Sequence, residues 1–125
     1  TQTNELLTQL ECFDGIFFAT TNLMDKLDQA CLRRFSHKIR FDYLKPDQSW
    51  NLFVQELERM GGDTAQAHTV EHQVRKLDYL TPGDFAVVER NVAVGGDMMA
   101  APAFLELLKN EVAVKMQGRG RVGFV

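Results

Sequence analysis

Cysteine, proline and long apolar runs are all scarce in this chain of 125 residues. The two cysteines, Cys12 and Cys31, stand in no CxxC or Cys/His spacing, so neither a zinc site nor a disulfide framework is expected. No apolar run approaches the length of a membrane span, and no signal peptide opens the chain. The sequence also lacks internal repeats and low-complexity tracts. These absences favour a cytoplasmic globular protein with reduced thiols and no metal site.

The composition sets the outer bounds on size and partners. A hydrophobic content of 45% is enough for one compact domain, or for a small domain plus part of another. The net charge of −3 gives no general attraction to nucleic acid or to an anionic membrane. The first residue is Thr rather than Met, and the sequence begins directly in a helical pattern. We therefore expect a piece of a longer protein.

The most informative stretch is GIFFATTNLMDKLDQACLRRFSHKIRF, residues Gly15–Phe41. Its apolar run Ile16–Ala19 predicts a strand buried on both faces of a parallel sheet, and a second strand is predicted over Ile39–Tyr43. Thr21 and Asn22 follow the first strand, at the sheet edge where ligands bind in open α/β folds. The neutral amide of Asn22 can reach a phosphate or an attacking water there, or it can cap the helix that follows.

Two adjacent arginines, Arg33 and Arg34, stand at the end of that short helix. A guanidinium group offers a planar fork of donors that matches phosphate oxygens, and it keeps its charge, as phosphoryl transfer requires. Paired arginines at a helix end also occur as a solvated face or as partners of the helix dipole. Both readings stay open from these residues alone.

Taken together, these residues resemble the second region of homology of the AAA+ ATPases. That pattern is a strand ending in Ala-Thr-Asn, then Leu-Asp-x-Ala-x-x-Arg, then Arg-Phe and another strand. The matching segments here are ATTN at Ala19–Asn22, LDQACLR at Leu27–Arg33, RF at Arg34–Phe35 and KIRF at Lys38–Phe41. About ten positions are fixed in order, so the resemblance is specific.

The resemblance implies roles for the residues of this stretch. Asn22 would be the sensor 1 residue, which orients water against the γ-phosphate of ATP, and Thr21 beside it would contact the nucleotide. Arg33 and Arg34 would be arginine-finger candidates that act on a nucleotide held by the neighbouring subunit. Many family members carry two residues between these arginines, whereas here they are adjacent, so both stay candidates.

The nucleotide site implied by the resemblance is incomplete in this sequence. It contains no GxxxxGK[ST] motif to cradle the phosphates and no strand ending in Asp-Glu to hold Mg²⁺ and activate water. ATP and Mg²⁺ would be bound by the parent protein, with the Mg²⁺ ligands outside this chain. We therefore expect no ATP hydrolysis by the chain alone. In the family a further strand separates the two predicted here, so their edges would be exposed and prone to self-association.

The pattern changes from strands to helices at Lys45-Pro46-Asp47. We therefore assign residues 1–46 to the carboxyl-terminal part of an α/β core and residues 47–125 to a helical lid domain. A clean apolar stripe, ended by Gly61-Gly62, predicts the first lid helix; its members are Trp50, Phe53, Val54 and Leu57. Four such helices with short links fit a small antiparallel bundle. The expected fold is a two-stranded remnant of a P-loop NTPase core followed by a helical lid, predominantly α.

The motif LTPGDF, Leu80–Phe85, predicts the start of another lid helix. Thr81 would be the N-cap, Pro82 the first helical residue, and Asp84 the acidic partner of a capping box. By the resemblance this helix start faces the nucleotide at the sensor 2 position, where Gly83 would allow close backbone approach and Asp84 would contact the ligand. An arginine of the sensor 2 type is absent.

The last helix is expected from Ala101-Pro102 onward, with Lys109 and Lys115 in solvent and a flexible basic tail, GRGRVGFV. The pattern near this end is similar to one bacterial branch of the AAA+ ATPases. By this resemblance the parent is a ring, expected to be a hexamer, that couples ATP hydrolysis to remodelling of an unidentified protein substrate. The alternative is a free-standing helical interaction module, whose basic residues bind an acidic partner or nucleic acid. Those residues are Arg33, Arg34, Lys38 and Arg40.

Overall fold

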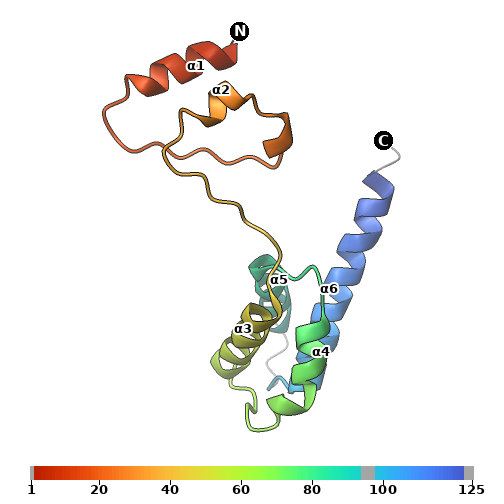
Figure 1. Cartoon of the computed structure of the whole chain (residues 1–125). Coiled ribbons are helices and arrows are strands. Elements are labelled where there is room, and N and C mark those ends of the chain that lie inside the picture. The colour runs from red at the N-terminus through yellow and green to blue at the C-terminus, as the bar shows by residue number, and fades with distance from the viewer. Residues whose placement is uncertain (1, 94–97, 123–125) are drawn as a thin grey trace. The chain divides into compact units, whose positions relative to one another are not determined.

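The computed structural model describes residues 2–93 and 98–122 of the chain. Within these ranges the protein is predominantly α-helical, as the sequence predicts, and β-strands are absent from the described residues. The chain divides into two compact units, Thr1–Arg40 and Phe41–Val125. Figure 1 shows helices α1 and α2 in the first unit and a bundle of helices α3 to α6 in the second.

The first unit contains helix α1 (Gln2–Glu11), a 3₁₀ turn η1 (Met24–Lys26) and the short helix α2 (Gln29–Leu32). Asp28 caps α2, because its carboxylate accepts a hydrogen bond from the Ala30 N–H at 3.2 Å. Cys31 is buried on this helix. Most other described side chains of the unit are exposed, so the unit has little core of its own.

The two predicted strands of the α/β remnant are not formed in the described residues. Residues 16–20 and 37–45 run without regular secondary structure. The apolar side chains of both segments lie in solvent: Ile16 is 82% exposed, Phe18 86%, Ile39 73% and Phe41 90%. A strand is stable only when a neighbouring strand pairs its N–H and C=O groups, and no described segment of this chain does so for either one.

The second unit is a helical bundle, as the sequence predicts. Helix α3 packs against α4, and α5 packs against α6 and α3 (Figure 1). The helices and the 3₁₀ turn that precedes α4 are α3 (Pro46–Arg59), η2 (Ala67–Val70), α4 (Glu71–Lys76), α5 (Pro82–Ala93) and α6 (Ala101–Val122).

The core of the bundle consists of apolar side chains that recur at helical spacing. Stacked and edge-to-face aromatic rings form its centre, with centroids 4.9 Å apart for Phe53 and Phe104 and 5.8 Å apart for Phe85 and Phe104. Trp50 is half-buried and stacks on Phe53 at 5.8 Å. The aliphatic residues buried around these rings are Leu57, Val70, Val74, Leu80, Val88, Leu105, Leu108 and Val112.

The sequence offers Asp47 as the N-cap of α3, but the helix begins two residues earlier than that cap implies, and it ends just before Gly61-Gly62, as predicted. Lys45 is the N-cap, and its N–H donates to the Gln48 side chain at 2.9 Å, while Pro46 takes the first helical position. At the other end Gly61 adopts φ +77°. The N–H of Gly62 then donates to the Leu57 carbonyl at 2.8 Å, which closes a Schellman motif.

The residues around 41–45 belong to the helical unit in the structure. The Leu44 N–H donates to the Leu80 carbonyl at 2.8 Å, which ties this segment to the start of α5. The division between the units therefore lies between residues 40 and 41, whereas the change of pattern in the sequence falls between 46 and 47. The predicted flexible tail begins inside α6, which continues to Val122; residues 123–125 lie outside the described part of the chain.

Candidate functional site

The first group of predicted site residues, Thr21 and Asn22, lies in the first unit between the apolar run and the 3₁₀ turn. The Thr21 hydroxyl accepts a hydrogen bond from the Leu23 N–H at 2.9 Å, which forms a local turn. Asn22 is exposed at a bend, and its side chain has no hydrogen bond to the described residues. Capping is done by Thr21 and Asp28, so the amide of Asn22 faces solvent and can contact a ligand.

The two adjacent arginines differ in their surroundings. The Nε atom of Arg34 lies 3.3 Å from Glu11 Oε1, so this guanidinium links the end of α2 to the end of α1. Arg33 is the C-cap of α2 and is exposed, and its side chain forms no ion pair with the described residues. An exposed ion pair contributes only about 0–1 kcal/mol, so Arg34 is biased toward this contact rather than locked in it. Arg33 has the side chain that is free to reach an external phosphate.

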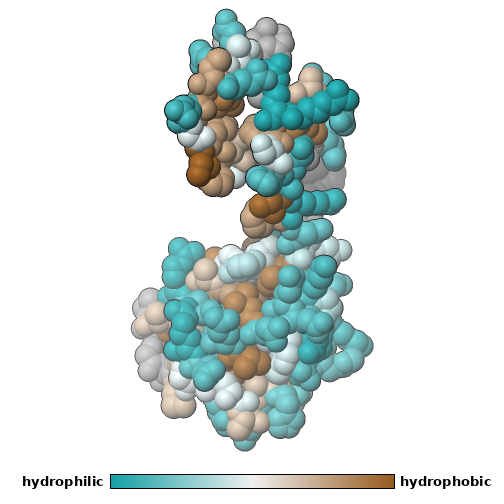
Figure 2. Space-filling model, turned by 60° about the vertical axis from the view of Figure 1, so that its left-hand side comes forward, coloured by the Kyte–Doolittle hydropathy of each residue, from teal (hydrophilic) through white to brown (hydrophobic). Residues whose placement is uncertain are grey.

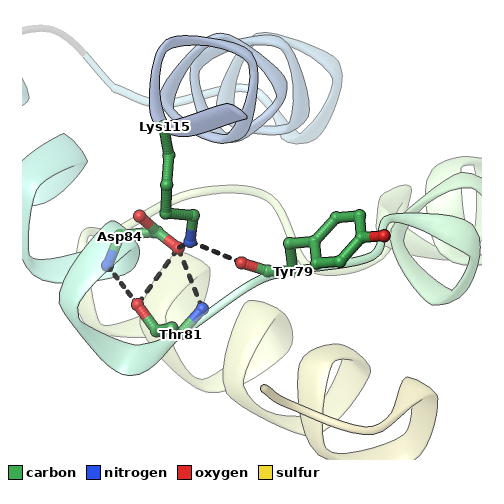
Figure 3. Close-up of polar contacts among 4 residues, drawn as sticks. All are labelled: Tyr79, Thr81, Asp84 and Lys115. Carbon is green, nitrogen blue, oxygen red and sulfur yellow. Dashed lines mark hydrogen bonds and ion pairs between the residues drawn. The ribbon is translucent and has the colours of Figure 1, made fainter. Parts of the chain in front are cut away.

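The second group lies at the start of α5, where Asp84 is buried (Figure 3). Its Oδ2 atom accepts hydrogen bonds from the Thr81 N–H at 2.9 Å and from the Thr81 hydroxyl at 3.1 Å. In return, the Asp84 N–H donates to the Thr81 hydroxyl oxygen at 3.3 Å. The predicted capping box, with Thr81 as N-cap and Pro82 in the first turn, is therefore confirmed.

Lys115 completes this cluster from the long helix α6. Its ammonium group lies 2.7 Å from Asp84 Oδ2 and also donates to the carbonyl oxygen of Tyr79, as Figure 3 shows. Tyr79 has φ +68°, a left-handed conformation that is uncommon outside glycine. The Lys115 ammonium is also 5.4 Å from the ring centre of Tyr43, within the range of a cation–π contact.

This arrangement bears directly on the predicted sensor 2 position. The Asp84 carboxylate already occupies the positive end of α5, and Lys115 neutralises it. A phosphate at this helix end would have to compete with the carboxylate for its donors, the Thr81 N–H and the Lys115 ammonium. Gly83 is exposed, and a Cβ atom at this position would make only an ordinary contact of 3.5 Å with the Thr81 hydroxyl. Of the two predicted lid residues, Gly83 is open to a ligand and Asp84 is engaged within the protein.

The structure places the two groups of predicted residues in different units. Thr21, Asn22, Arg33 and Arg34 belong to the first unit, and Gly83 and Asp84 belong to the second. Within the first unit, the amide and the guanidinium groups are exposed. They are neutral and cationic donors, which suit an anionic ligand such as a phosphate.

A separate charged cluster links α3 to α5. Arg59 lies 2.7 Å from Glu56 and 2.7 Å from Glu89. Burial raises the pKa of Glu89, and its contact with the neighbouring carboxylate of Glu56 acts in the same direction. The pKa of Glu56 is lowered, first by the hydrogen bond that it accepts from Glu89 and then by Arg59. Of the two carboxylates, Glu89 is therefore the one that holds a proton to the higher pH.

Beside this cluster is an open hollow of about 370 Å³, and none of the predicted site residues line it. Its walls come from the end of α3 and from α5, and they carry both apolar and charged side chains. The lining residues are Arg59, Met60, Ala86, Glu89, Arg90 and Ala93.

In the cluster around Asp84 at the start of α5, Lys115 is the residue that the sequence did not identify. The sequence suggests that it stays in solvent, but its side chain is 26% exposed and holds an ion pair. The available signal is its spacing on α6, because it follows the buried Val112 by three residues and so lies on the same side of the helix. Its partner Asp84 is 31 residues away in sequence, and no local pattern identifies such a pair.

Among residues 2–93 and 98–122, no group of three or more His, Cys, Asp and Glu side chains is placed to hold a metal ion. Within the same ranges, no helix has the length and apolar character needed to cross a bilayer. No family model matches the chain, and no curated protein or solved structure shows significant similarity to it.

Proposed function

We propose that this chain is the carboxyl-terminal part of an AAA+ ATPase module, comprising the sensor 1 and arginine-finger end of its α/β core and its helical lid. The observation that carries the proposal is the ordered motif ATTN, LDQACLR, RF and KIRF between Ala19 and Phe41. The exposure of Asn22 and Arg33 supports it, because both side chains must be free to reach a ligand. The helical bundle that follows the motif supports the lid assignment.

The proposed roles follow from the chemistry of the side chains. Asn22 holds the attacking water against the γ-phosphate of ATP through neutral hydrogen bonds, which add no charge to the site. We assign Arg33 rather than Arg34 as the arginine finger, since Arg34 already contacts Glu11 within the same unit. Its guanidinium neutralises the charge that develops on the phosphoryl group, in the site of the neighbouring subunit of a ring. ATP and its Mg²⁺ ion are held by the phosphate loop and acidic residues of the complete protein.

The lid in this proposal takes part through Gly83 and the start of α5. Asp84 acts as the helix cap that fixes the position of Gly83, held by Thr81 and Lys115, rather than as a ligand of the nucleotide. Lid rotation would then transmit nucleotide turnover to a protein substrate that the ATPase remodels.

The test is ATP turnover and ATP binding by the complete protein with single substitutions. Arg33→Ala should lower kcat by about 10³-fold or more, the range for removal of an arginine finger, with nucleotide affinity changed only a few-fold. Asn22→Ala should likewise lower kcat with little effect on binding. Arg34→Ala is the matched control, since it removes a guanidinium one residue away and should have the smaller effect. Unchanged turnover in the Arg33 and Asn22 variants would refute the assignment.

The interaction-module alternative predicts a different result. If the basic residues of the first unit bind a polyanion, the 125-residue chain should bind heparin or nucleic acid with an affinity that falls steeply as salt rises. Under the ATPase proposal, such binding is weak, because the chain has a net charge of −3.

A further inference from the structure

The helical unit is a body with its own core, and the short segment ahead of α3, residues 41–45, is fastened to it. Phe53, Leu57 and Phe104 are completely buried in that core. Hydrophilic side chains cover most of the face of this unit that Figure 2 shows in the lower part of the view. A segment bound firmly to such a body moves with it, so the contacts of residues 41–45 decide where the chain can bend between the two units.

Two contacts join this segment to the residues that lead into α5. The Leu44 N–H donates to the Leu80 carbonyl oxygen at 2.8 Å. The ring of Tyr43 meets the ring of Tyr79 edge to face, with centroids 5.3 Å apart, which is a favoured geometry for aromatic pairs. Phe41, two residues earlier in the chain, is 90% exposed. The attachment to the helical unit therefore begins at Tyr43.

Lys115 on α6 contacts both sides of this attachment. Its ammonium group lies 5.4 Å from the centre of the Tyr43 ring and donates to the carbonyl oxygen of Tyr79. The same ammonium group is 2.7 Å from Asp84 Oδ2 at the start of α5, as Figure 3 shows. One side chain thus links the start of α5 to the segment ahead of α3.

The backbone of Tyr79 makes the attachment depend on Lys115. Tyr79 has φ +68°, a left-handed conformation that costs free energy in a residue with a Cβ atom. The hydrogen bond from Lys115 to the Tyr79 carbonyl oxygen and the ring contact with Tyr43 both favour this conformation. Without the ammonium group, Tyr79 can relax to a negative φ, which turns its ring and its carbonyl group away from their present partners.

We propose that Lys115, Tyr43 and Tyr79 form a clasp. The clasp makes residues 43–45 part of the helical unit, so the chain between the two units bends at residues 41–42. The second strand that the sequence predicts for the core would then end before Tyr43.

The consequence for lid rotation rests on the proposed function, in which the start of α5 is the part of the lid that faces the nucleotide. Through Lys115, that part and the chain that leaves the α/β core belong to one body. A movement of the start of α5 then reaches the core through a short bend, because the residues ahead of α3 are not loose enough to absorb it.

The test is amide hydrogen exchange and NMR of the 125-residue chain without nucleotide, so its result is independent of the ATPase proposal. We expect a protected Leu44 N–H, contacts between the rings of Tyr43 and Tyr79 in nuclear Overhauser spectra, and nitrogen relaxation that shows more motion at residues 41–42 than at Leu44. Lys115→Met should accelerate exchange at Leu44 by about tenfold or more and remove the ring contacts, because the clasp loses a charged hydrogen bond and a cation–π contact.

Two further variants separate the clasp from general stability. Gly61→Ala perturbs the other end of α3, where φ is +77°, so it should accelerate exchange of the core amides and leave Leu44 nearly unchanged. Tyr43→Leu removes one ring of the clasp and keeps the ion pair between Lys115 and Asp84. This variant should accelerate exchange at Leu44 several-fold, with the core amides unchanged.

Three outcomes would overturn the proposal: an unprotected Leu44 N–H in the parent chain, the same change at Leu44 in Lys115→Met and Gly61→Ala, or relaxation that shows Tyr43 and Leu44 to be as mobile as the residues before them. Far-UV circular dichroism checks that each variant keeps the helical signal of the parent chain. If Lys115→Met loses that signal, Tyr43→Leu decides the matter, and unchanged exchange at Leu44 in this variant would refute the clasp.

Discussion

Replacement of Lys115 by methionine tests the role of the cluster at the start of α5. Methionine keeps most of the apolar stem of lysine and removes the ammonium group, so the packing of α6 changes little. The substitution abolishes the 2.7 Å ion pair with Asp84 and the hydrogen bond to the Tyr79 carbonyl. Asp84 keeps its two hydrogen bonds from Thr81, so its carboxylate is not left entirely without donors.

The magnitude follows from the burial of the pair. The side chains of Lys115 and Asp84 are 26% and 12% exposed, so the pair is neither fully buried nor at the surface. A hydrogen bond between charged groups contributes about 1.5–3 kcal/mol, and partial solvent screening places this one at the lower end. We expect Lys115→Met to lower the free energy of unfolding by about 1.5–2 kcal/mol, which lowers Tm by roughly 6–16 °C in a domain of this size.

The assay is urea unfolding followed by the fluorescence of Trp50, the only tryptophan of the chain, which is half-buried in the second unit. Lys109→Met is the matched control on the same helix. Lys109 contacts Gln73 and Glu106 in more exposed positions, so its loss should cost less than about 0.5 kcal/mol. Equal effects of the two substitutions would refute the reasoning. In a double-mutant cycle, Lys115→Met and Asp84→Asn should couple by about 1 kcal/mol.

Two further predictions concern the acid pair and the glycines. The raised pKa of Glu89 means that its charged form is disfavoured in the folded protein, so stability from this group is present at low pH and is lost as pH rises through the folded pKa. Glu89→Gln should therefore gain stability relative to the parent chain as pH rises above about 4.5. Glu56→Gln should lose stability over the same range, because the pKa of Glu56 is lowered. Urea midpoints at pH 3 to 7 measure both effects, and the same trend in the two variants would contradict the assignment. Gly61→Ala should destabilise the protein by about 1 kcal/mol, because Gly61 has φ +77°. Gly118→Ala should stabilise it by about 0.5–1 kcal/mol, because Gly118 lies inside α6 with open space around it. Thermal unfolding compares the two variants, and effects of the same sign would contradict the backbone argument.

The helices of the second unit were predictable because their signals are local. Apolar residues at helical spacing, the Thr81 and Asp84 capping box and the Gly61 stop all act within a few residues of one another. Each of these features satisfies backbone groups of the same helix, so a short window of sequence contains the necessary information.

The prediction of the two strands was wrong because strand formation depends on residues far away in the sequence. Ile16–Ala19 has the composition of a buried strand, but a strand forms only with a partner, and no described segment supplies one. The same limit applies to the candidate site. Glu11 lies 23 positions before Arg34 in the sequence, and Lys115 lies 31 positions after Asp84, so the contacts that distinguish Arg33 from Arg34 and engage Asp84 depend on tertiary structure.

The most direct test of the ATPase proposal is complementation between two inactive forms of the complete protein. One form carries Arg33→Ala, and the other carries a substitution of the lysine in its phosphate loop. Each should hydrolyse ATP very slowly alone. After mixing and subunit exchange, some interfaces combine an intact nucleotide site from the first form with an intact Arg33 from the second. The proposal predicts that the mixture regains a substantial part of the parent turnover, whereas a mixture as inactive as its components would contradict the action of Arg33 in trans.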